Sequence, residues 1–428
     1  MSISTGWILI MAVLLAVGMP IAFAVILSGI VAITVLGAAP LRLIPIMMFQ
    51  GINSFLLIAV PLFLLVGKIM EAGGTAKMIF DSANTTVGWV RGGMGHVNIV
   101  GSMIFGGISG SSVADAGSLG RIATFAMYRT GYPKNYSAGL SVVASTLAII
   151  IPPSVPMVIY AVSASESVGR LLASGLVPGI FVGLVLMLIH YGMCLKRGWE
   201  YKESFSFATL LRTFRRSFWA LLTPFVILGT IFSGIVTATE GAAVAVLYCF
   251  LISTVIYGEM GWATLWGCIK ESARDSGAIL FMISAASLVS YLLAADRVPQ
   301  NLAEWVIANS PGPAFTISGI IVLLLIAGML MDPASAIIIL VPVLVPVAKQ
   351  IGYNSVHFGL IFVVTMAIGL ITPPVAPCLM VTCQVTDTRM EDVIVECLPF
   401  ILGMIAALGV LIAFPSLSLW FPNLLFGK

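Results

Sequence analysis

Two short strings decide the fold of this chain: IIPPSVP at residues 150–156 and ITPPVAP at residues 371–377. Each places two consecutive prolines and a third proline inside a long apolar stretch. Proline lacks the backbone N–H group that a helix needs and clashes with the preceding turn, so each stretch must be an interrupted helix. The two strings lie 221 residues apart, since 371 − 150 = 221, and the same shift places Gly107 on Gly328. We therefore predict an internal repeat.

The parts of the proposed repeat follow the same order twice: a span, an amphipathic connector, a hairpin and a broken helix. The first copy covers residues 54–165, with hairpin 97–128 and broken helix 137–165, and the second covers residues 276–386, with hairpin 314–348 and broken helix 356–386. Each hairpin is predicted because two short apolar arms flank a polar tip, SGSS in the first and DPAS in the second. A re-entrant bend of this kind is tolerated in a membrane only where protein or water surrounds it.

The composition sets the class of protein. About 60% of the 428 residues are apolar and 9% are charged, whereas a soluble domain carries roughly 25% charged residues. With a mean hydropathy of +1.12, the chain is predicted to be an all-α polytopic membrane protein. The net charge of +3 is too small and too scattered to suggest nucleic acid as a partner. The first apolar stretch, 6–38, is too long for a cleaved signal peptide, and its GMP interruption allows one kinked helix or two shorter pieces.

The remaining spans give the orientation. We expect an N-terminal scaffold part at residues 1–53 and further scaffold spans at 171–258. A polar piece at 259–275 would precede the span 276–295, and a C-terminal span would lie within 387–428. Loop 196–217 holds six Lys or Arg residues against two Glu, so the positive-inside rule places it in the cytoplasm. Counting spans from this loop makes the two repeats antiparallel, which is an inverted repeat. TATE at 237–240 has the form of a helix capping box.

Broken helices supply chemistry to such a fold. Each break leaves backbone N–H and C=O groups without partners inside the helix. A half-helix N-terminus suits an anion, while freed carbonyls and hydroxyls suit a cation. Hairpin tips beside broken helices can therefore build a Na⁺ site and a carboxylate site with few charged side chains. The oxygen-bearing side chains in question are Ser109, Ser111, Ser112 and Thr146 in one half, and Asp332, Ser335 and Thr372 in the other.

Each of three charged residues near the hairpins has two possible roles. Asp115 falls in the second arm of the first hairpin, where a carboxylate is costly, so a functional role is the default; the alternative is a structural pair with Arg121. Arg121 itself either meets a substrate carboxylate or extends to the cytoplasmic end of its arm. Asp332 fits equally well as the N-cap of a helix that starts at Pro333 and as part of a Na⁺ site.

Other chemistries find little support. The six cysteines form no C-x-x-C pair and are expected to be free apolar side chains. The three histidines, His96, His190 and His357, are far apart in the sequence, which argues against a zinc or iron site. An intramembrane enzyme would need a nucleophile–base set or a carboxylate-rich metal motif. We therefore predict that the protein is not an enzyme and binds no organic cofactor, and that it is not a channel.

The hairpin and break strings together resemble a known family. GISGSSVADAG at residues 107–117 resembles the first hairpin of the large membrane subunit of TRAP (tripartite ATP-independent periplasmic) transporters, and IPPS at 151–154 and GLITPPV at 369–375 resemble its two broken-helix motifs. The resemblance extends over essentially the whole chain. It implies an elevator-type secondary transporter, in which hairpins and broken helices move as a transport domain against a scaffold domain. APC at 376–378 departs from the glycine that many members have there.

The resemblance also implies a function. It implies Na⁺-driven import of an organic acid, such as a sialic acid, a C4-dicarboxylate or a sugar acid, through the bacterial inner membrane. A small four-helix membrane subunit and a periplasmic substrate-binding protein would be its partners. The Na⁺ sites map onto Gly110, Ser111, Ser112, Ser145, Thr146 and Ala148, and onto Gly328, Asp332, Gly369 and Thr372; the substrate would meet Ser109, Asp115, Pro153, Ser154 and Pro374. A stand-alone Na⁺/dicarboxylate symporter of the citrate type, without a binding protein, is the alternative.

Overall fold

The computed structural model describes residues 10–427, except residues 12, 15–16, 37–39, 200, 202–203, 299–300, 302–303 and 305–309. Every regular element within these ranges is a helix, which confirms the all-α class. Seven of the described helices are long and apolar enough to cross a membrane, and an eighth span is counted when one bent pair is taken as a single crossing. The fold is therefore that of a multi-pass membrane protein.

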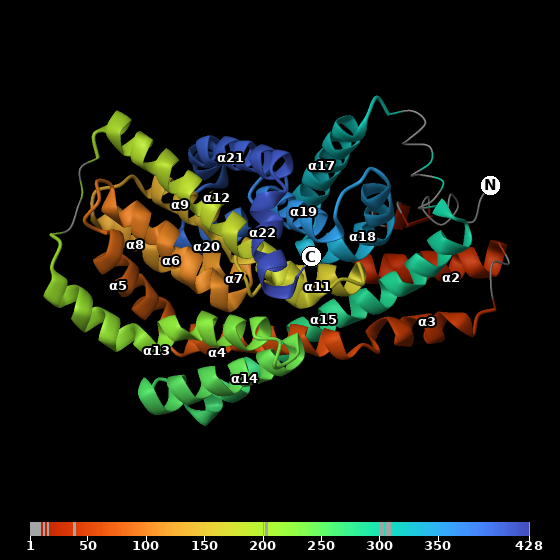
Figure 1. Cartoon of the computed structure of the whole chain (residues 1–428), viewed down its shortest axis with the longest axis horizontal. Helices are drawn as coiled ribbons and strands as arrows, with labels where there is room; N and C mark the ends of the chain where they lie inside the picture. Colours follow the sequence, from red (N-terminus) through yellow and green to blue (C-terminus); the bar gives the residue numbers. More distant parts are fainter. Residues whose placement is uncertain are drawn as a thin grey trace.

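One layer consists of apolar helices of different lengths that run along the lower side of Figure 1. The helix α15 is its centre, because α15 packs against α2, α3 and α4. The helix α4 also packs against α14, which in turn packs against α13. We call this group the α15 layer; its members are α2 (Ile21–Leu36), α3 (Leu43–Ile52), the 3₁₀ turn η1 (Phe55–Ile58), α4 (Ala59–Ala72), α13 (Phe207–Phe232), α14 (Ala238–Leu251), its π-helical extension η2 (Ile252–Ile256) and α15 (Trp262–Ala295).

The α15 layer corrects one prediction and confirms another. The expected polar piece 259–275 is not separate from the span 276–295, because α15 is continuous from Trp262 to Ala295. Its charged residues stay in the helix since Lys68 of α4 lies 3.1 Å from Glu271 and 3.7 Å from Asp275. At the start of α14 the predicted capping box is present. At the N-terminus α2 begins directly after Gly18 (φ +87°) and Pro20, so the described part of stretch 6–38 is interrupted where expected.

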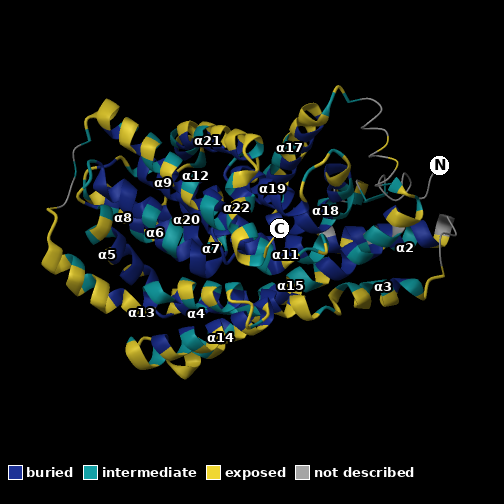
Figure 2. Cartoon of the chain, viewed as in Figure 1, coloured by how far each residue is buried: buried dark blue, intermediate teal, exposed yellow. Residues whose placement is uncertain are grey.

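The other layer contains the hairpins and broken helices, and we call it the hairpin layer. Its members are α5 (Thr75–Val87), α6 (Gly93–Ser109), α7 (Ser112–Gly117), α8 (Leu119–Arg129), α9 (Lys134–Ser145), α10 (Leu147–Ile150), α11 (Val155–Ser163), α12 (Val168–Arg197), α17 (Pro313–Leu330), α18 (Pro333–Gln350), α19 (Ser355–Gly369), α20 (Pro377–Thr386), α21 (Met390–Ala413) and α22 (Ser416–Phe426). Buried residues are concentrated in this layer, as Figure 2 shows. All 15 residues of α19 are buried, so this helix lies at the centre of the core.

Both broken helices are interrupted at their prolines. The helix α10 ends at Ile150 and α11 begins at Val155, and the segment Lys134–Ile150, which is α9 with α10, meets α11 at a bend of 41°. In the second half α19 ends at Gly369 and α20 begins at Pro377. The peptide bonds Pro152–Pro153 and Pro373–Pro374 are both cis. The breaks therefore lie where the sequence predicts them.

Each hairpin approaches its broken helix through glycine. A Cβ atom at Gly106 of α6 would lie 2.5 Å from the Ala148 Cα of α10, and one at Gly369 of α19 would lie 2.6 Å from the Gly328 Cα of α17. Ala148 and Gly369 are themselves 221 residues apart, so the contacts use equivalent positions of the broken helices, while the hairpin glycines Gly106 and Gly328 differ from the repeat register by one residue. Only residues without a side chain permit helix backbones to come this close. The re-entrant course of α17 and α18 stays a prediction, because each is 18 residues long and apolar enough to cross a membrane.

Candidate functional site

A cleft opens where the two hairpins meet the α15 layer. Its volume, including the open mouth, is about 570 Å³. Both hairpin tips line it, together with residues beside both helix breaks and one residue each from α4 and α15. The lining residues are Leu64, Gly110, Ser111, Ser112, Val113, Ile149, Val155, Pro156, Ile279, Asp332, Pro333, Ala334, Leu370 and Pro377. A concave apolar site with a few convergent polar groups is the usual form of a small-molecule site.

The first hairpin tip presents hydroxyl groups to the cleft. The Ser111 hydroxyl accepts a hydrogen bond from the Ala114 N–H at 3.4 Å and so caps α7. Ser112 is 2% exposed, and its hydroxyl has no hydrogen-bond partner among the described residues. The tip is fixed to the first broken helix, because the Gly110 carbonyl accepts from the Val155 N–H at 3.4 Å. Ser112 therefore lines the cleft with a hydroxyl that has no partner but is itself almost fully covered by the surrounding atoms.

The second hairpin tip presents a carboxylate. Asp332 is the N-cap of α18, where it accepts hydrogen bonds from the Ser335 N–H at 3.1 Å and from the Ser335 hydroxyl. The N-cap reading of Asp332 is thus confirmed, and its place in a Na⁺ site stays a prediction. The next residue, Pro333, has no N–H to offer. This tip is also tied to its broken helix, since the Met329 carbonyl accepts from the Val375 N–H at 3.2 Å.

The predicted Na⁺-site hydroxyls of the broken helices bond to their own helices. Ser145 and Thr146 donate to backbone carbonyls at 2.8 and 2.7 Å, and Thr372 donates to another at 2.7 Å. A hydroxyl that donates keeps its lone pairs, so all three oxygens are still able to accept a cation. The first-hairpin helices α6 and α7 contact α9 and α10, and α17 contacts α19. The structure thus places the two halves of each predicted Na⁺ site on neighbouring elements.

None of the residues predicted to meet the substrate is among the residues that line the cleft. Ser154 caps α11, and its hydroxyl donates to the Ile149 carbonyl at 2.6 Å. Pro153 directs its carbonyl toward the first hairpin tip, 2.9 Å from where a Gly110 Cβ would be. The Ser109 backbone lies against Gly67 of α4, its hydroxyl accepts from the Ser111 N–H at 3.5 Å, and Pro374 is exposed in the second break. Their direct contact with a substrate stays a prediction.

Asp115 lies within the hairpin layer and is fully buried. Ser102 of α6 lies beside it, yet neither the carboxylate oxygens nor the Ser102 hydroxyl has a partner at hydrogen-bond geometry among the described residues. The alternative of a structural pair with Arg121 is wrong, since Arg121 is exposed and forms no ion pair with it. An unpaired buried carboxylate is costly, and within a membrane such a group indicates function.

A second polar cluster was not anticipated from the sequence. The rings of His96 and His190 lie 4.8 Å apart, so two of the three histidines are not isolated. The His190 Nδ1 lies 2.7 Å from the Tyr136 hydroxyl, and its Nε2 lies 2.9 Å from the Gly92 carbonyl. Tyr132 is part of this cluster. No group of three or more potential metal-ligating side chains occurs in the described ranges.

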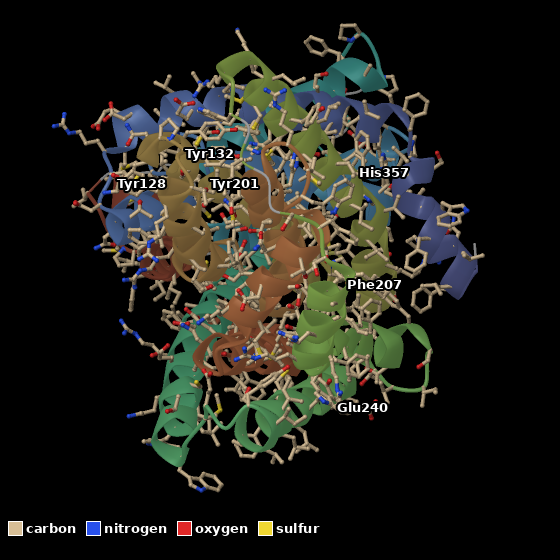
Figure 3. All side chains as sticks on the ribbon, turned by 90° about the vertical axis from the view of Figure 1, so that its left-hand side faces the viewer. Tyr128, Tyr132, Tyr201, Phe207, Glu240 and His357 are labelled. Atoms are coloured by element: carbon tan, nitrogen blue, oxygen red, sulfur yellow. The ribbon has the colours of Figure 1, made fainter. Side chains whose placement is uncertain are left out.

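This histidine cluster joins the start of α6 to α9 and α12. Figure 3 shows Tyr132 and Tyr201 at the same end of the molecule, far from Glu240. The Arg197 guanidinium lies over the Tyr136 ring and pairs with Glu396 of α21 at 2.8 Å. Histidines that are 94 residues apart give no spacing signal, so only the fold reveals the contact.

The sequence of the chain is similar to known membrane transport proteins. The family model for the tripartite ATP-independent periplasmic transporter, DctM component, matches residues 8–417. The chain belongs to this family. As a TRAP large permease, it is 36% identical over 397 residues to the C4-dicarboxylate TRAP transporter large permease protein DctM of Pseudomonas aeruginosa, covering 93% of each chain. It is 33% identical to the sialic acid TRAP transporter large permease protein SiaM of Vibrio cholerae, covering 97% of each.

A solved structure supports the fold of this TRAP large permease. The YdaH transporter of Alcanivorax borkumensis superposes with a TM-score of 0.67 at 12% sequence identity, covering 89% of this chain and 88% of that one. At such low identity the likeness shows the fold alone. The resemblance inferred from the hairpin and break strings is confirmed at the level of the family.

Proposed function

We propose that this TRAP large permease imports an organic acid by Na⁺-coupled secondary transport. The observation that carries the proposal is the composition of the cleft, which is lined at once by both hairpin tips, by both broken helices and by the α15 layer. The named relatives transport a C4-dicarboxylate and a sialic acid, and both cargoes carry carboxylates. The cleft would hold the carboxylate at the first tip.

An elevator movement would use the boundary at which the cleft lies. Leu64 and Ile279 belong to the α15 layer, whereas the other lining residues belong to the hairpin layer. A Cβ atom at Gly67 of α4 would lie 3.2 Å from the Ser109 carbonyl oxygen, so the first tip passes close to α4. Displacement of the hairpin layer would carry the tips and cargo past Leu64 and Ile279. The α15 layer would then be the scaffold domain and the hairpin layer the transport domain, so α12, which the sequence prediction assigns to the scaffold spans, would instead move with the hairpins.

Na⁺ would act at the hairpin tips. Each Na⁺ that enters down the membrane potential contributes about 2.3 kcal/mol per 100 mV, before its concentration gradient is counted. The predicted sites use backbone carbonyls and hydroxyls, which are ligands that suit a hard cation. Binding there would order the tips and complete the carboxylate site, which couples the ion to the cargo. The unpaired Asp115 carboxylate would add negative charge in the same half.

The TRAP family architecture supplies the proposed partners. In the bacterial inner membrane, a small four-helix subunit would extend the scaffold domain, and a periplasmic binding protein would deliver the organic acid. A stand-alone symporter would need neither partner. The two alternatives therefore differ in whether uptake depends on added binding protein.

Uptake into proteoliposomes tests the proposal. The permease is reconstituted with the small subunit and the binding protein encoded beside it, and a labelled organic acid that the binding protein retains is offered outside. We expect uptake that requires both an inward Na⁺ gradient and the binding protein. Full uptake with K⁺ or choline in place of Na⁺ would contradict Na⁺ coupling. Full uptake without binding protein would instead favour the stand-alone symporter.

A further inference from the structure

The start of α13 carries three arginines on its outer side. Arg212, Arg215 and Arg216 are exposed, and their spacing of three and four residues places them on one side of the helix. None of the three forms an ion pair with a described acidic residue. Asp81 of α5 is the acidic group near Arg216, and Lys77 lies near the same carboxylate. These three arginines, which we call the basic stripe, therefore keep a net positive charge.

A second exposed stripe runs beside the basic stripe. Leu211 lies four residues before Arg215, so the two stripes are in contact along the helix. Figure 2 shows exposed residues along this part of α13. We call the second set the apolar stripe; its members repeat at helical spacing and are between 41% and 68% exposed: Phe207, Leu211, Phe214 and Phe218.

The rest of the protein holds α13 by the side that neither stripe occupies. The helix packs against α5 and α14. The buried Ser217 hydroxyl donates to the Met78 carbonyl of α5 at 3.0 Å. The Tyr257 hydroxyl, which follows α14 and η2, accepts from the Ala220 N–H at 3.0 Å. Both stripes are thus left facing away from these neighbours.

A small polar hollow lies at the end of the basic stripe. Its volume, including the open mouth, is about 250 Å³, and it lies between the end of α5 and the start of α13. Trp89 and Phe205 line it with their rings edge to face, 6.1 Å between centroids, and each of its other described lining residues carries a hydroxyl or an amide. One of these, Thr209, precedes Arg212 by three residues, so the hollow adjoins the basic stripe.

The stripes occupy the part of α13 that is expected at a membrane surface. The basic stripe belongs to loop 196–217, which the positive-inside rule places in the cytoplasm, and it directly precedes the apolar part of α13. Tryptophan favours the level of the lipid headgroups. Trp89 and Trp219 are both exposed beside the stripes. The arginines are therefore expected at the depth of the phosphates of the cytoplasmic leaflet.

An anionic phospholipid matches both stripes at once. Guanidinium groups bind phosphate oxygens in two-point contact, and an acyl chain covers an apolar helix face. A protein partner would instead have to bury three neighbouring guanidinium groups, which is costly unless each of them meets an acidic group. The charge and the shape of the surface thus favour a lipid.

We propose that the basic stripe, the apolar stripe and the hollow form a binding site for an anionic phospholipid whose headgroup carries hydroxyls, such as phosphatidylglycerol. The phosphate lies among the three arginines, the headgroup hydroxyls lie at the hollow, and an acyl chain lies along the apolar stripe. The site is separate from the cleft between the hairpin tips. It depends neither on the cargo nor on Na⁺.

Lipid binding to the purified complex tests this proposal. The permease with its small subunit is titrated in detergent with dioleoyl phosphatidylglycerol or with dioleoyl phosphatidylcholine, and bound lipids are counted by native mass spectrometry. The two lipids share their acyl chains, and only the first carries a net negative charge. Each basic side chain near an anionic headgroup contributes roughly a factor of five. We therefore expect phosphatidylglycerol to bind tighter by about tenfold or more.

Charge variants locate the site. Changing the basic stripe to glutamine (Arg212→Gln, Arg215→Gln and Arg216→Gln together) should reduce the preference for phosphatidylglycerol to about twofold or less. Changing the same three positions to lysine keeps the charge and should retain most of the preference. The matched control removes three exposed basic side chains outside the stripe and should leave the preference unchanged: Arg129→Gln, Lys270→Gln and Arg274→Gln.

A further substitution tests the apolar stripe. Phe214→Ser removes one of its aromatic rings and should weaken binding of phosphatidylglycerol about fivefold. Phe225→Ser is the control, because Phe225 is exposed farther along α13 and lies outside both stripes. Equal affinities in these two variants would contradict an acyl chain along the apolar stripe.

Two other results would overturn the proposal as a whole. One is equal binding of the two lipids by the unmodified complex, or an undiminished preference in the glutamine variant, which would leave only unselective lipid around the protein. The other is a preference that emerges only after the small subunit is removed, because the subunit would then be the occupant of the stripes. Since lipid binding is the readout, neither result bears on whether Na⁺ drives transport.

Discussion

Gly106→Ala should separate the first hairpin from its broken helix. The new Cβ atom would lie 2.5 Å from the Ala148 Cα and 2.8 Å from its Cβ, where ordinary contacts begin at 3.4 Å. The two helices must therefore move apart by 3.4 − 2.5, or roughly 1 Å. Overpacking typically costs about 1–3 kcal/mol, while alanine gains about 1 kcal/mol over glycine in helix propensity. Because backbone atoms are unable to rotate away, the upper end of the overpacking cost applies, and we expect a net loss of about 2 kcal/mol.

The loss should be visible in both stability and transport. If all of it falls on the cargo-bound state, a loss of about 2 kcal/mol corresponds to roughly 30-fold weaker binding. The assays are thermal unfolding in nanodiscs and Na⁺-driven uptake in proteoliposomes. Gly319→Ala is the control, since no atom lies within 4 Å of the Cβ position at Gly319 in α17. Equal stability and uptake in the two variants would refute the close contact between α6 and α10.

Three further substitutions test other features. If Asp115 helps to bind Na⁺, the melting temperature of the unmodified protein should rise when K⁺ is replaced by Na⁺. Asp115→Asn keeps the side-chain shape but removes the buried charge, so this rise should disappear. An unchanged rise would contradict a role for Asp115 in ion binding. Thr237→Ala removes the cap that Thr237 shares with Glu240 and should lower the free energy of unfolding by about 1 kcal/mol without altering cargo selectivity, as measured by thermal unfolding and competition binding. Arg197→Lys replaces the guanidinium contacts of 3.1 and 2.8 Å to both Glu396 oxygens by a single ammonium contact. Because Arg197 is partly exposed, the free energy of unfolding should fall by only about 0.5 kcal/mol. A fall above about 2 kcal/mol in thermal unfolding would show that more than this surface pair is involved.

Local rules account for the features that the sequence predicts well. The Pro-Pro pairs at 152–153 and 373–374 must interrupt a helix wherever the rest of the chain lies. The same holds for the capping box at 237–240, whose two hydrogen bonds are formed between near neighbours. The helix cap at Asp332 is also a short-range feature. These elements needed no knowledge of tertiary packing.

The rest depends on contacts between distant residues. Leu64 and Ile279 line the cleft, but the sequence of a membrane helix does not distinguish a leucine or isoleucine that lines a cleft from one that faces lipid. The proximity of His96 to His190 arises because α6 and α12 pack together. The continuity of α15 was missed since its charged turns read as a polar connector, while Lys68 on another helix neutralises them.

The complete enclosure of α19 has a mechanical consequence. A helix moves past its surroundings only along a face that is not interlocked with buried neighbours on every side. None of the 15 residues of α19 offers such a face. Its neighbours include α10, α11, α12, α17 and α18. Any movement that displaces α19 must carry these helices along as one rigid unit, so the boundary between moving and stationary helices has to lie outside this group.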